Sequence, residues 1–453
     1  MGRRALLAEP ALIYDASSRE RSHAGFFCAL FRAMDEVNAS YCVLARPEAI
    51  GNSAEISLAM QRTDKAKLTK TFRILRKRGY LPIRCSEKSV DALLFHFGWL
   101  NAGVVDTAVL HVAFGQHVCG RMLISAEALL QGRQRRAHYW SASPVAEFEW
   151  LLAKLVADKQ LSPPEIERVY ELSLLLPEVK AESVAVTLFG RNVGAKIAGL
   201  CRKRSINPTI SELRRRLWMR SLLQPVQLLH HSVRQVFRSR ANSRGALIVL
   251  LGPDGSGKST VAGLLSSSLR PILARQRLYH WRPALLGKGT LGQATTDPHR
   301  FAPRDSLTSS LYLAGFFFDH VLGFLLKIRP FLASSGLVVF DRHFCDVVAD
   351  PRRYRYGGPA WLARLLTQVV PPREKLALIL EASDANTVSR KSELSLSEIR
   401  RQREAYRKLS FGKSATTRIV ATDQGVRSTQ NQALSATLEY LADNFLKRYE
   451  CFN

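Results

Sequence analysis

The sequence predicts an α/β protein in two parts. An N-terminal α+β domain is followed by a C-terminal domain with a parallel sheet of about five strands and helices on both faces. In the second half, short apolar runs alternate with helical stretches, a pattern typical of parallel sheets. One of these runs ends in a glycine-rich loop that leads directly into a helix. The first half mixes short strand-like runs with helical stretches, which favours an α+β arrangement.

The chain is long and strongly basic. Its 453 residues are more than one average domain needs, and 46% of them are apolar, enough for ordinary buried cores. The 66 Lys and Arg against 38 Asp and Glu give a net charge of +28. This balance favours anionic partners such as nucleotides, nucleic acids, acidic glycans or lipid headgroups, without choosing among them. The seven scattered cysteines and the poor secretory signal at the N-terminus favour a reduced, cytoplasmic location.

The first half divides into a tail and a folded domain. Residues 1–23 are expected to form a loose tail, and residues 24–200 a domain with a helical extension. Apolar spacing predicts helices over 26–34, 68–78 and 144–198, and strands over 41–44, 56–60, 92–97 and 107–114.

A basic connector is expected over 201–244. From residue 202 onward it contains eleven Lys and Arg and one acid, Glu212, with apolar residues at near-helical spacing. A solvated helical linker is the favoured interpretation. The alternative is attachment to an anionic membrane surface, which would place the protein at the inner membrane face. Nucleic acid is the least favoured partner because no helicase-type motif set accompanies the glycine-rich loop. A homodimer is left open.

The C-terminal domain, 245–453, begins with a strand over 246–251, which is followed by the loop GPDGSGKST and a helix that continues to 269. Gly255 and Gly257 allow the loop amides to point at phosphate oxygens, and the helix N-terminus adds partial positive charge. Lys258 supplies a full charge to the β- and γ-phosphates, and the hydroxyl of Ser259 is a ligand for Mg²⁺. The predicted nucleotide-binding residues are Gly252, Asp254, Gly255, Ser256, Gly257, Lys258, Ser259 and Thr260.

A second candidate group follows the apolar strand over 337–340, which ends in Asp341 and Arg342. The carboxyl end of a parallel strand faces the phosphate loop, so Asp341 can orient Mg²⁺ or the acceptor. Arg342 can hold a phosphate through two parallel hydrogen bonds.

Basic residues around 390–407, after a strand over 376–380, are suited to a lid that closes over the phosphates. The alternative is a solvated basic helix. A last strand over 418–421 leads to Asp423 and a C-terminal helix, and a long loop is expected over 287–306. The apolar stretch 309–326 is interpreted as a buried helix, with a membrane span as the less favoured alternative.

Three segments together resemble the thymidylate kinase family of nucleoside monophosphate kinases: GPDGSGKST, FDRHFCD at 340–346 and SRKSEL at 389–394. A closer resemblance is to a divergent branch that often accompanies bacterial surface-polysaccharide genes. That branch carries the segment DPRRYRYGG, found here at 350–358. The resemblance covers about 245–452.

The resemblance implies ATP-dependent phosphoryl transfer with Mg²⁺ to a nucleoside monophosphate. It assigns Lys258 and Ser259 to the binding of ATP phosphates and Mg²⁺, and Asp254 to contact with the acceptor. Asp341 and Arg342 would contact the acceptor and its phosphate. Arg282 would be a further phosphate contact, and Arg390 would be the lid arginine. Two departures weigh against dTMP as the acceptor. The segment His280–Pro283 lacks the glycines of the family's acceptor loop, and His343 replaces the usual Tyr.

The first half resembles a nucleotidyltransferase domain over 41–45 and 51–58. Such domains place Gly-Ser before an Asp-x-Asp pair, with a third carboxylate on a later strand, to hold two Mg²⁺. Here the pair reads Glu55 and Ser57, and the third position falls at His111. A hydroxyl and an imidazole do not replace anionic Mg²⁺ ligands. The resemblance therefore implies a degenerate domain, inactive in nucleotidyl transfer.

Three functions compete. The first is a kinase for a small anionic acceptor, most simply a nucleoside monophosphate. The second is a kinase acting on a sugar or a lipid-linked glycan in surface polysaccharide synthesis. The third is a nucleotide-binding regulator or scaffold without turnover of a small molecule. A panel of nucleoside monophosphates distinguishes the first from the others.

Overall fold

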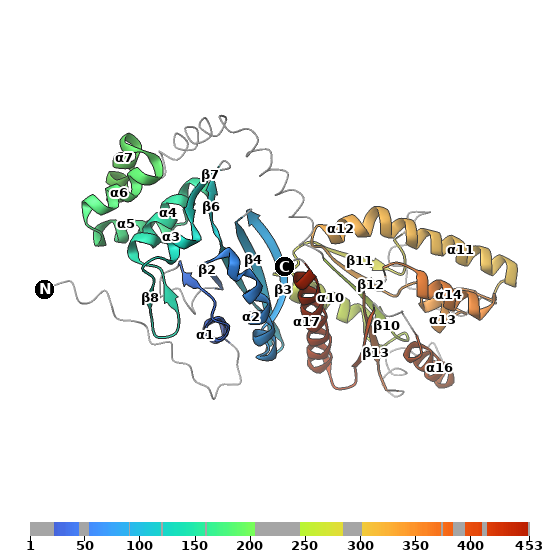
Figure 1. The fold of residues 1–453 in the computed structure, drawn as a ribbon. Helices are drawn as coiled ribbons and strands as arrows, with labels where there is room; N and C mark the ends of the chain where they lie inside the picture. The colour runs from blue at the N-terminus through green and yellow to red at the C-terminus, as the bar shows by residue number, and fades with distance from the viewer. Residues whose placement is uncertain are drawn as a thin grey trace. The chain divides into compact units, whose positions relative to one another are not determined.

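A computed structural model describes most of the chain, which divides into two compact units (Figure 1). The first unit comprises Met1–Trp99, Thr107–Asn242 and Asn444–Asn453, and the second comprises Leu100–Asp106 and Ser243–Asp443. The structure describes residues 22–44, 54–89, 91–118, 121–158, 161–203, 245–283, 301–372, 375–383, 395–409 and 415–451.

The first unit contains a seven-stranded mixed sheet with the order β3-β4-β5-β2-β1-β9-β8, and a separate hairpin of β6 and β7. The central pair β2 and β5 is parallel, whereas β1 pairs with β2, and β3 with β4, in antiparallel orientation. The strands are β1 (Tyr41–Val43), β2 (Glu55–Met60), β3 (Leu81–Ser89), β4 (Ala92–Asn101), β5 (Val104–Ala113), β6 (Gly115–Val118), β7 (Arg121–Ser125), β8 (Gln134–Arg135) and β9 (Trp140–Ser141).

The helices of this unit bury apolar faces, some against the strands and others against neighbouring helices. Helix α1 starts at His23, where the Ser22 side chain accepts a hydrogen bond from the amide of Gly25. Its aromatic residues pack on those of β4; Phe26, for example, stacks on Trp99 at 5.6 Å between ring centroids. The helices of the unit are α1 (His23–Glu36), α2 (Lys65–Lys77), α3 (Ala126–Leu130), α4 (Pro144–Asp158), α5 (Pro163–Leu175), α6 (Glu178–Phe189) and α7 (Arg191–Cys201), with a 3₁₀ turn at Arg62–Asp64. The α+β prediction is confirmed.

The second unit contains a five-stranded sheet with the order β11-β12-β10-β13-β14, in which every neighbouring pair is parallel. Strands β10, β12 and β13 are apolar runs buried along almost their whole length, as the centre of a sheet flanked by helices requires. The strands are β10 (Ala246–Leu251), β11 (Gln276–His280), β12 (Leu337–Asp341), β13 (Leu376–Glu381) and β14 (Thr416–Ala421). The predicted α/β fold is confirmed.

Helices connect these strands. Helix α10 contacts β10 and β12, and α16 contacts β13. The helices are α10 (Lys258–Leu269), α11 (Ser306–Gly323), the π-turn η5 (Phe324–Ile328), α12 (Arg329–Ala333), α13 (Asp346–Ala349), α14 (Ala360–Val369), α16 (Leu396–Arg407) and α17 (Val426–Cys451).

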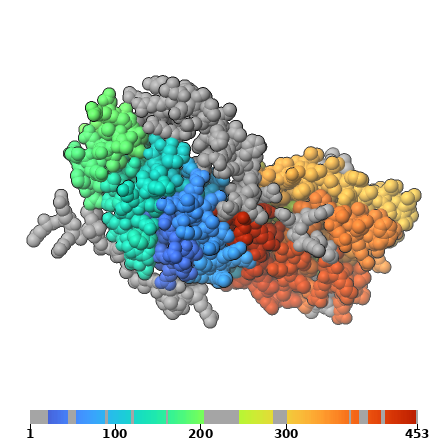
Figure 2. All heavy atoms as spheres, in the orientation of Figure 1, coloured from blue at the N-terminus to red at the C-terminus, as the bar shows by residue number. Residues whose placement is uncertain are grey.

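The apolar stretch 309–326 is helical as predicted, but the expectation that this helix is buried was wrong. Leu311, Phe318 and Leu326 are 67%, 58% and 67% exposed. The residues of α11 and α12, amber in Figure 2, form part of the outer surface of the second unit. By length and composition, Ser306–Ala333 is the one helix among the described residues that could cross a membrane. The core helix of a soluble protein passes the same test of length and composition.

Several predictions fall outside the described residues. They concern residues 1–21 of the tail, the connector over 204–244, most of the loop over 287–306, the lid arginine Arg390 and the segment 51–53.

Candidate active site

The glycine-rich loop between β10 and α10 has the backbone that its sequence requires. Gly252, Gly255 and Gly257 have φ values of 145°, 81° and 89°, which L-residues rarely adopt. A Cβ on Gly252 would lie 2.5 Å from the carbonyl oxygen of Leu380 on the neighbouring strand. The glycines therefore serve both the tight turn and the close packing of the loop on the sheet.

Lys258 is the first residue of α10 and is 7% exposed. Its Nζ donates hydrogen bonds to the carbonyl oxygens of Gly252 at 2.9 Å and Pro253 at 2.7 Å. Burial lowers the pKa of Lys258 to about 8, with Arg342 adding to the shift and Asp254 opposing it. The side chain thus lies over its own loop, where the phosphates of a nucleotide would lie.

Ser259 and Asp341 lie together. The hydroxyl of Ser259 donates a hydrogen bond to Oδ2 of Asp341 at 3.0 Å. Asp341 is the last residue of β12. It lies directly beside β10, where Leu250 is its register partner. The Nδ1 of His280, at the end of β11, lies 3.6 Å from the same carboxylate. Burial would raise the pKa of Asp341, but His280, Lys258 and Arg342 outweigh it and lower that pKa.

This pair fits the requirements of Mg²⁺. Oδ1 of Asp341 is buried and has no hydrogen-bond partner within the described part of the chain, so an acceptor oxygen remains for a cation. Mg²⁺ in nucleotide sites takes one or two protein oxygens and otherwise phosphates and water. In the described ranges, no group of three or more His, Cys, Asp and Glu could hold a metal ion. A Mg²⁺ site with one or two protein ligands does not need such a group.

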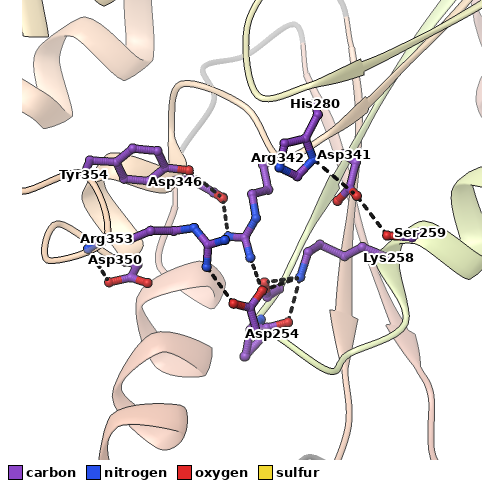
Figure 3. A network of polar contacts seen from close by, with 12 residues as sticks. Asp254, Lys258, Ser259, His280, Asp341, Arg342, Asp346, Asp350, Arg353 and Tyr354 are labelled. Atoms are coloured by element: carbon purple, nitrogen blue, oxygen red, sulfur yellow. Dashed lines mark hydrogen bonds and ion pairs between the residues drawn. The ribbon is translucent and has the colours of Figure 1, made fainter. Parts of the chain in front are cut away.

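Next to this pair, an ion-pair network joins the loop to the residues after β12 (Figure 3). Arg342 has a φ of 77° and its guanidinium bridges Asp254 and Asp346, 2.9 Å from the latter. Arg353 Nη1 donates a hydrogen bond to Oδ2 of Asp254 at 2.6 Å. Burial would raise the pKa of Asp254, but Arg342, Lys258 and Arg353 together lower it well below its usual range. The Asp254 carboxylate is therefore ionised and surrounded by cations.

One cavity of about 710 Å³ is lined by most of these groups: Asp254, Lys258, Ser259, His280, Asp341, Arg342 and Arg353. A second wall comes from the end of β14 and the start of α17. That wall consists of Thr422, Asp423, Gly425, Val426, Thr429 and Gln430. Cavities that hold small molecules in proteins have a comparable volume. The cavity thus extends from the glycine-rich loop to the wall formed by the end of β14 and the start of α17.

The structure brings most of the predicted site residues together. Asp254, Gly255, Gly257, Lys258, Ser259, Thr260, Asp341 and Arg342 all line the cavity, and Gly252 and Ser256 complete the turn of the loop. Ser256 is itself buried, at 1% exposure.

Arg282 lies apart from the cavity lining. Its Nη1 is 3.9 Å from Oδ2 of the buried Asp319 on α11, and its guanidinium lies 5.7 Å from the ring centroid of Trp281. Trp281 stacks on Tyr354 with 4.7 Å between ring centroids. The phosphate-binding role assigned to Arg282 therefore stays a prediction.

Arginines of the basic helix α16 form ion pairs and hydrogen bonds outside the cavity. Arg401 pairs with Glu398 and donates to the carbonyl oxygen of Ala349, while Arg407 pairs with Glu381. Tyr406 is fully buried in the core of the unit. None of these residues lines the cavity as described.

Sequence reasoning gave no role to three residues of the network: His280, Asp346 and Arg353. Arg353 belongs to the DPRRYRYGG segment, which was noted only as a family marker. The wall from β14 and α17 was not predicted either, because Asp423 was named only as the residue after the last strand. Its carboxylate accepts two hydrogen bonds from the amide of Ser383, at 2.8 and 2.7 Å.

In the first unit, the structure places the motif residues Ser57 and His111 side by side. They are register partners on the parallel strands β2 and β5, with 3.3 Å between Oγ and Nδ1. His111 is 4% exposed. The two positions that the resemblance singled out therefore adjoin on neighbouring strands.

No protein-family model matches the chain. A probable thymidylate kinase from Methanosarcina barkeri (strain Fusaro / DSM 804) is 31% identical over 122 residues, which are 27% of this chain and 53% of that protein. The chain thus spans about half the length of the curated relative it matches. The crystal structure of thymidylate kinase from Ehrlichia chaffeensis aligns with a TM-score of 0.30 and 18% identity, over 43% of this chain and 97% of that one.

Proposed function

We propose that the second unit is an ATP-dependent kinase that transfers a phosphoryl group to a nucleoside monophosphate, with dTMP as the first acceptor to be tested. The observation that supports this most strongly is the convergence of Lys258, Ser259, Asp341 and Arg342 in one cavity. The similarity to a probable thymidylate kinase adds the reaction class.

In this proposal the loop amides and Lys258 hold the β- and γ-phosphates of ATP. Lys258 leaves the carbonyl oxygens of Gly252 and Pro253 when the phosphates bind. Ser259 and Asp341 would hold Mg²⁺, which would supply charge neutralisation on the phosphates. Arg342 binds the phosphate of the acceptor, and Asp341 orients the acceptor oxygen toward the γ-phosphate. Positioning and charge neutralisation provide most of the rate enhancement in such sites.

The acceptor is tested with a panel of nucleoside monophosphates, by separating the diphosphate products after incubation with MgATP. We expect one or more of them to be phosphorylated. If none is converted while ATP still binds, the proposal fails for nucleoside monophosphates. Sugar or lipid-linked glycan acceptors, or a regulatory role without turnover, then become the leading functions.

A further inference from the structure

Arg353 presents its guanidinium to the cavity beside that of Arg342, although no predicted site motif includes it. The two arginines, called here the arginine pair, both follow β12 in the chain, and both donate hydrogen bonds to the Asp254 carboxylate (Figure 3). Each binds a different oxygen of that carboxylate. All three residues line the cavity that holds Lys258 and Ser259.

Groups other than Asp254 hold the side chain of Arg342 and the backbone of Arg353. Nη1 of Arg342 is bound to Asp346 at 2.9 Å, and the side chain of Asp346 is fully buried and also accepts a hydrogen bond from the Tyr354 hydroxyl at 3.3 Å. The backbone amide of Arg353 donates to Oδ1 of Asp350 at 3.3 Å. Removing the Asp254 carboxylate would therefore leave the Arg342 guanidinium oriented by Asp346, and the Arg353 guanidinium beside it on a backbone anchored by Asp350.

Two guanidinium groups on the two oxygens of one anion are the arrangement that binds a phosphate. Guanidinium donors match phosphate oxygens in planar, paired geometry, and a phosphomonoester dianion offers more charge and one more oxygen than a carboxylate. Asp254 meanwhile keeps the cations together when no such anion is bound, because three cationic side chains this close would otherwise repel one another.

We propose that Arg353 is a second phosphate-binding residue for the acceptor: with Arg342 it binds the acceptor's phosphomonoester in place of the Asp254 carboxylate. Asp346 is the positioning residue for Arg342. The acceptor is consequently a phosphorylated molecule and not a bare hydroxyl compound. This inference rests on the proposed kinase function, and it names the chemical group by which that site recognises its acceptor.

The test compares Arg353→Gln with Arg352→Gln. Both changes remove one positive charge from adjacent positions, but Arg352 is exposed and outside the cavity lining. With dTMP or another accepted monophosphate, we expect Arg353→Gln to raise the acceptor KM about 10- to 100-fold, as loss of a charged hydrogen bond does. The KM for ATP should stay within about twofold in both variants. Equal acceptor KM values for the two variants, or a matching loss of ATP affinity in Arg353→Gln, would overturn the proposal.

A second readout does not depend on turnover. Inorganic phosphate is titrated calorimetrically into the full chain saturated with Mg²⁺ and a non-hydrolysable ATP analogue. We expect phosphate to bind the wild type and Arg352→Gln equally, Arg353→Gln about tenfold more weakly, Arg353→Lys in between, and Asp254→Asn more tightly than the wild type. Weaker binding to Asp254→Asn would show that Asp254 supports the phosphate site instead of occupying it. If dTMP is not phosphorylated but this ranking holds, the arginine pair stands and only the nucleotide acceptor is lost.

Discussion

In both units a polar pair forms at a parallel strand, but its members come from different elements: the adjacent strands β2 and β5 in the first unit, and the end of β12 and the start of α10 in the second. Between β2 and β5 the pair is Ser57 and His111, 3.3 Å apart. At the end of β12 the pair is Asp341 with Ser259, 3.0 Å apart, surrounded by ionised side chains. The two pairs thus differ both in the elements that supply them and in charge, and the charge of the side chains decides which pair is suited to a metal ion and phosphates. The predictions below test this difference.

The largest effect is expected from removing the negative charge at the end of β12. Asp341→Asn keeps the shape of the side chain but weakens the Mg²⁺ ligand, so we expect kcat to fall about 10²- to 10³-fold. Nucleotide affinity measured without Mg²⁺ should change little. A kcat within a few-fold of wild type at saturating Mg²⁺ would show that Asp341 does not act through the metal.

The next effect concerns the loop backbone. Gly252→Ala places a methyl group 2.5 Å from the Leu380 carbonyl at a φ of 145°. We expect a loss of about 2 kcal/mol in unfolding free energy, together with weaker nucleotide binding. The matched control is Gly263→Ala in α10, where an added Cβ meets nothing within 4 Å. That change should stabilise the protein by about 0.5–1 kcal/mol. Urea unfolding of both variants checks the opposite signs.

A smaller effect should depend on pH. Burial holds the pKa of His343 well below its usual value, with Lys375 and His320 adding to the shift. Below about pH 6.5 the unfolded chain takes up a proton that the folded chain does not, so this residue costs stability as pH falls, up to about 1.4 kcal/mol per pH unit. We expect His343→Phe to lose less stability than wild type between pH 7 and 5 in denaturant titrations. If the unfolding free energies of the two proteins fell equally between pH 7 and 5, His343 would not be the origin of the acid sensitivity.

The smallest effect is expected in the first unit. Ser57→Ala and His111→Ala remove the polar pair between β2 and β5, and neither residue carries the charge that Mg²⁺ needs. Steady-state ATP consumption by the second unit's site should therefore remain within about twofold of wild type. A loss of activity comparable to that of Asp341→Asn would mean that the first unit takes part in the reaction.

The sequence was sufficient for the elements whose patterns are local. The apolar runs of β10, β12, β13 and β14 and the glycine-rich loop predicted the parallel sheet and the residues at its carboxyl edge. Strand β11 was missed because it is a polar edge strand, QRLYH, with no buried residue to mark it. Burial of α11 was wrongly predicted, because composition reports how apolar a helix is and not what covers it.

The network around Asp254 could not be predicted for a different reason. Asp254 and Arg353 lie 99 positions apart in the chain, and only the fold brings them into contact. The same applies to the wall formed by β14 and α17, whose Thr429 and Gln430 carry no motif of their own. Residues after strands can be placed from topology, whereas partners contributed by loops and distant helices require the tertiary structure.

The most direct test of the central claim is ATP consumption by the full chain with Mg²⁺ and dTMP, comparing wild type with Lys258→Ala. We predict turnover that requires dTMP and falls at least about 100-fold in Lys258→Ala, because the lysine supplies the charge that stabilises the transferring phosphoryl group. Undiminished dTMP-dependent turnover in Lys258→Ala would contradict the claim that the glycine-rich loop is the site of phosphoryl transfer.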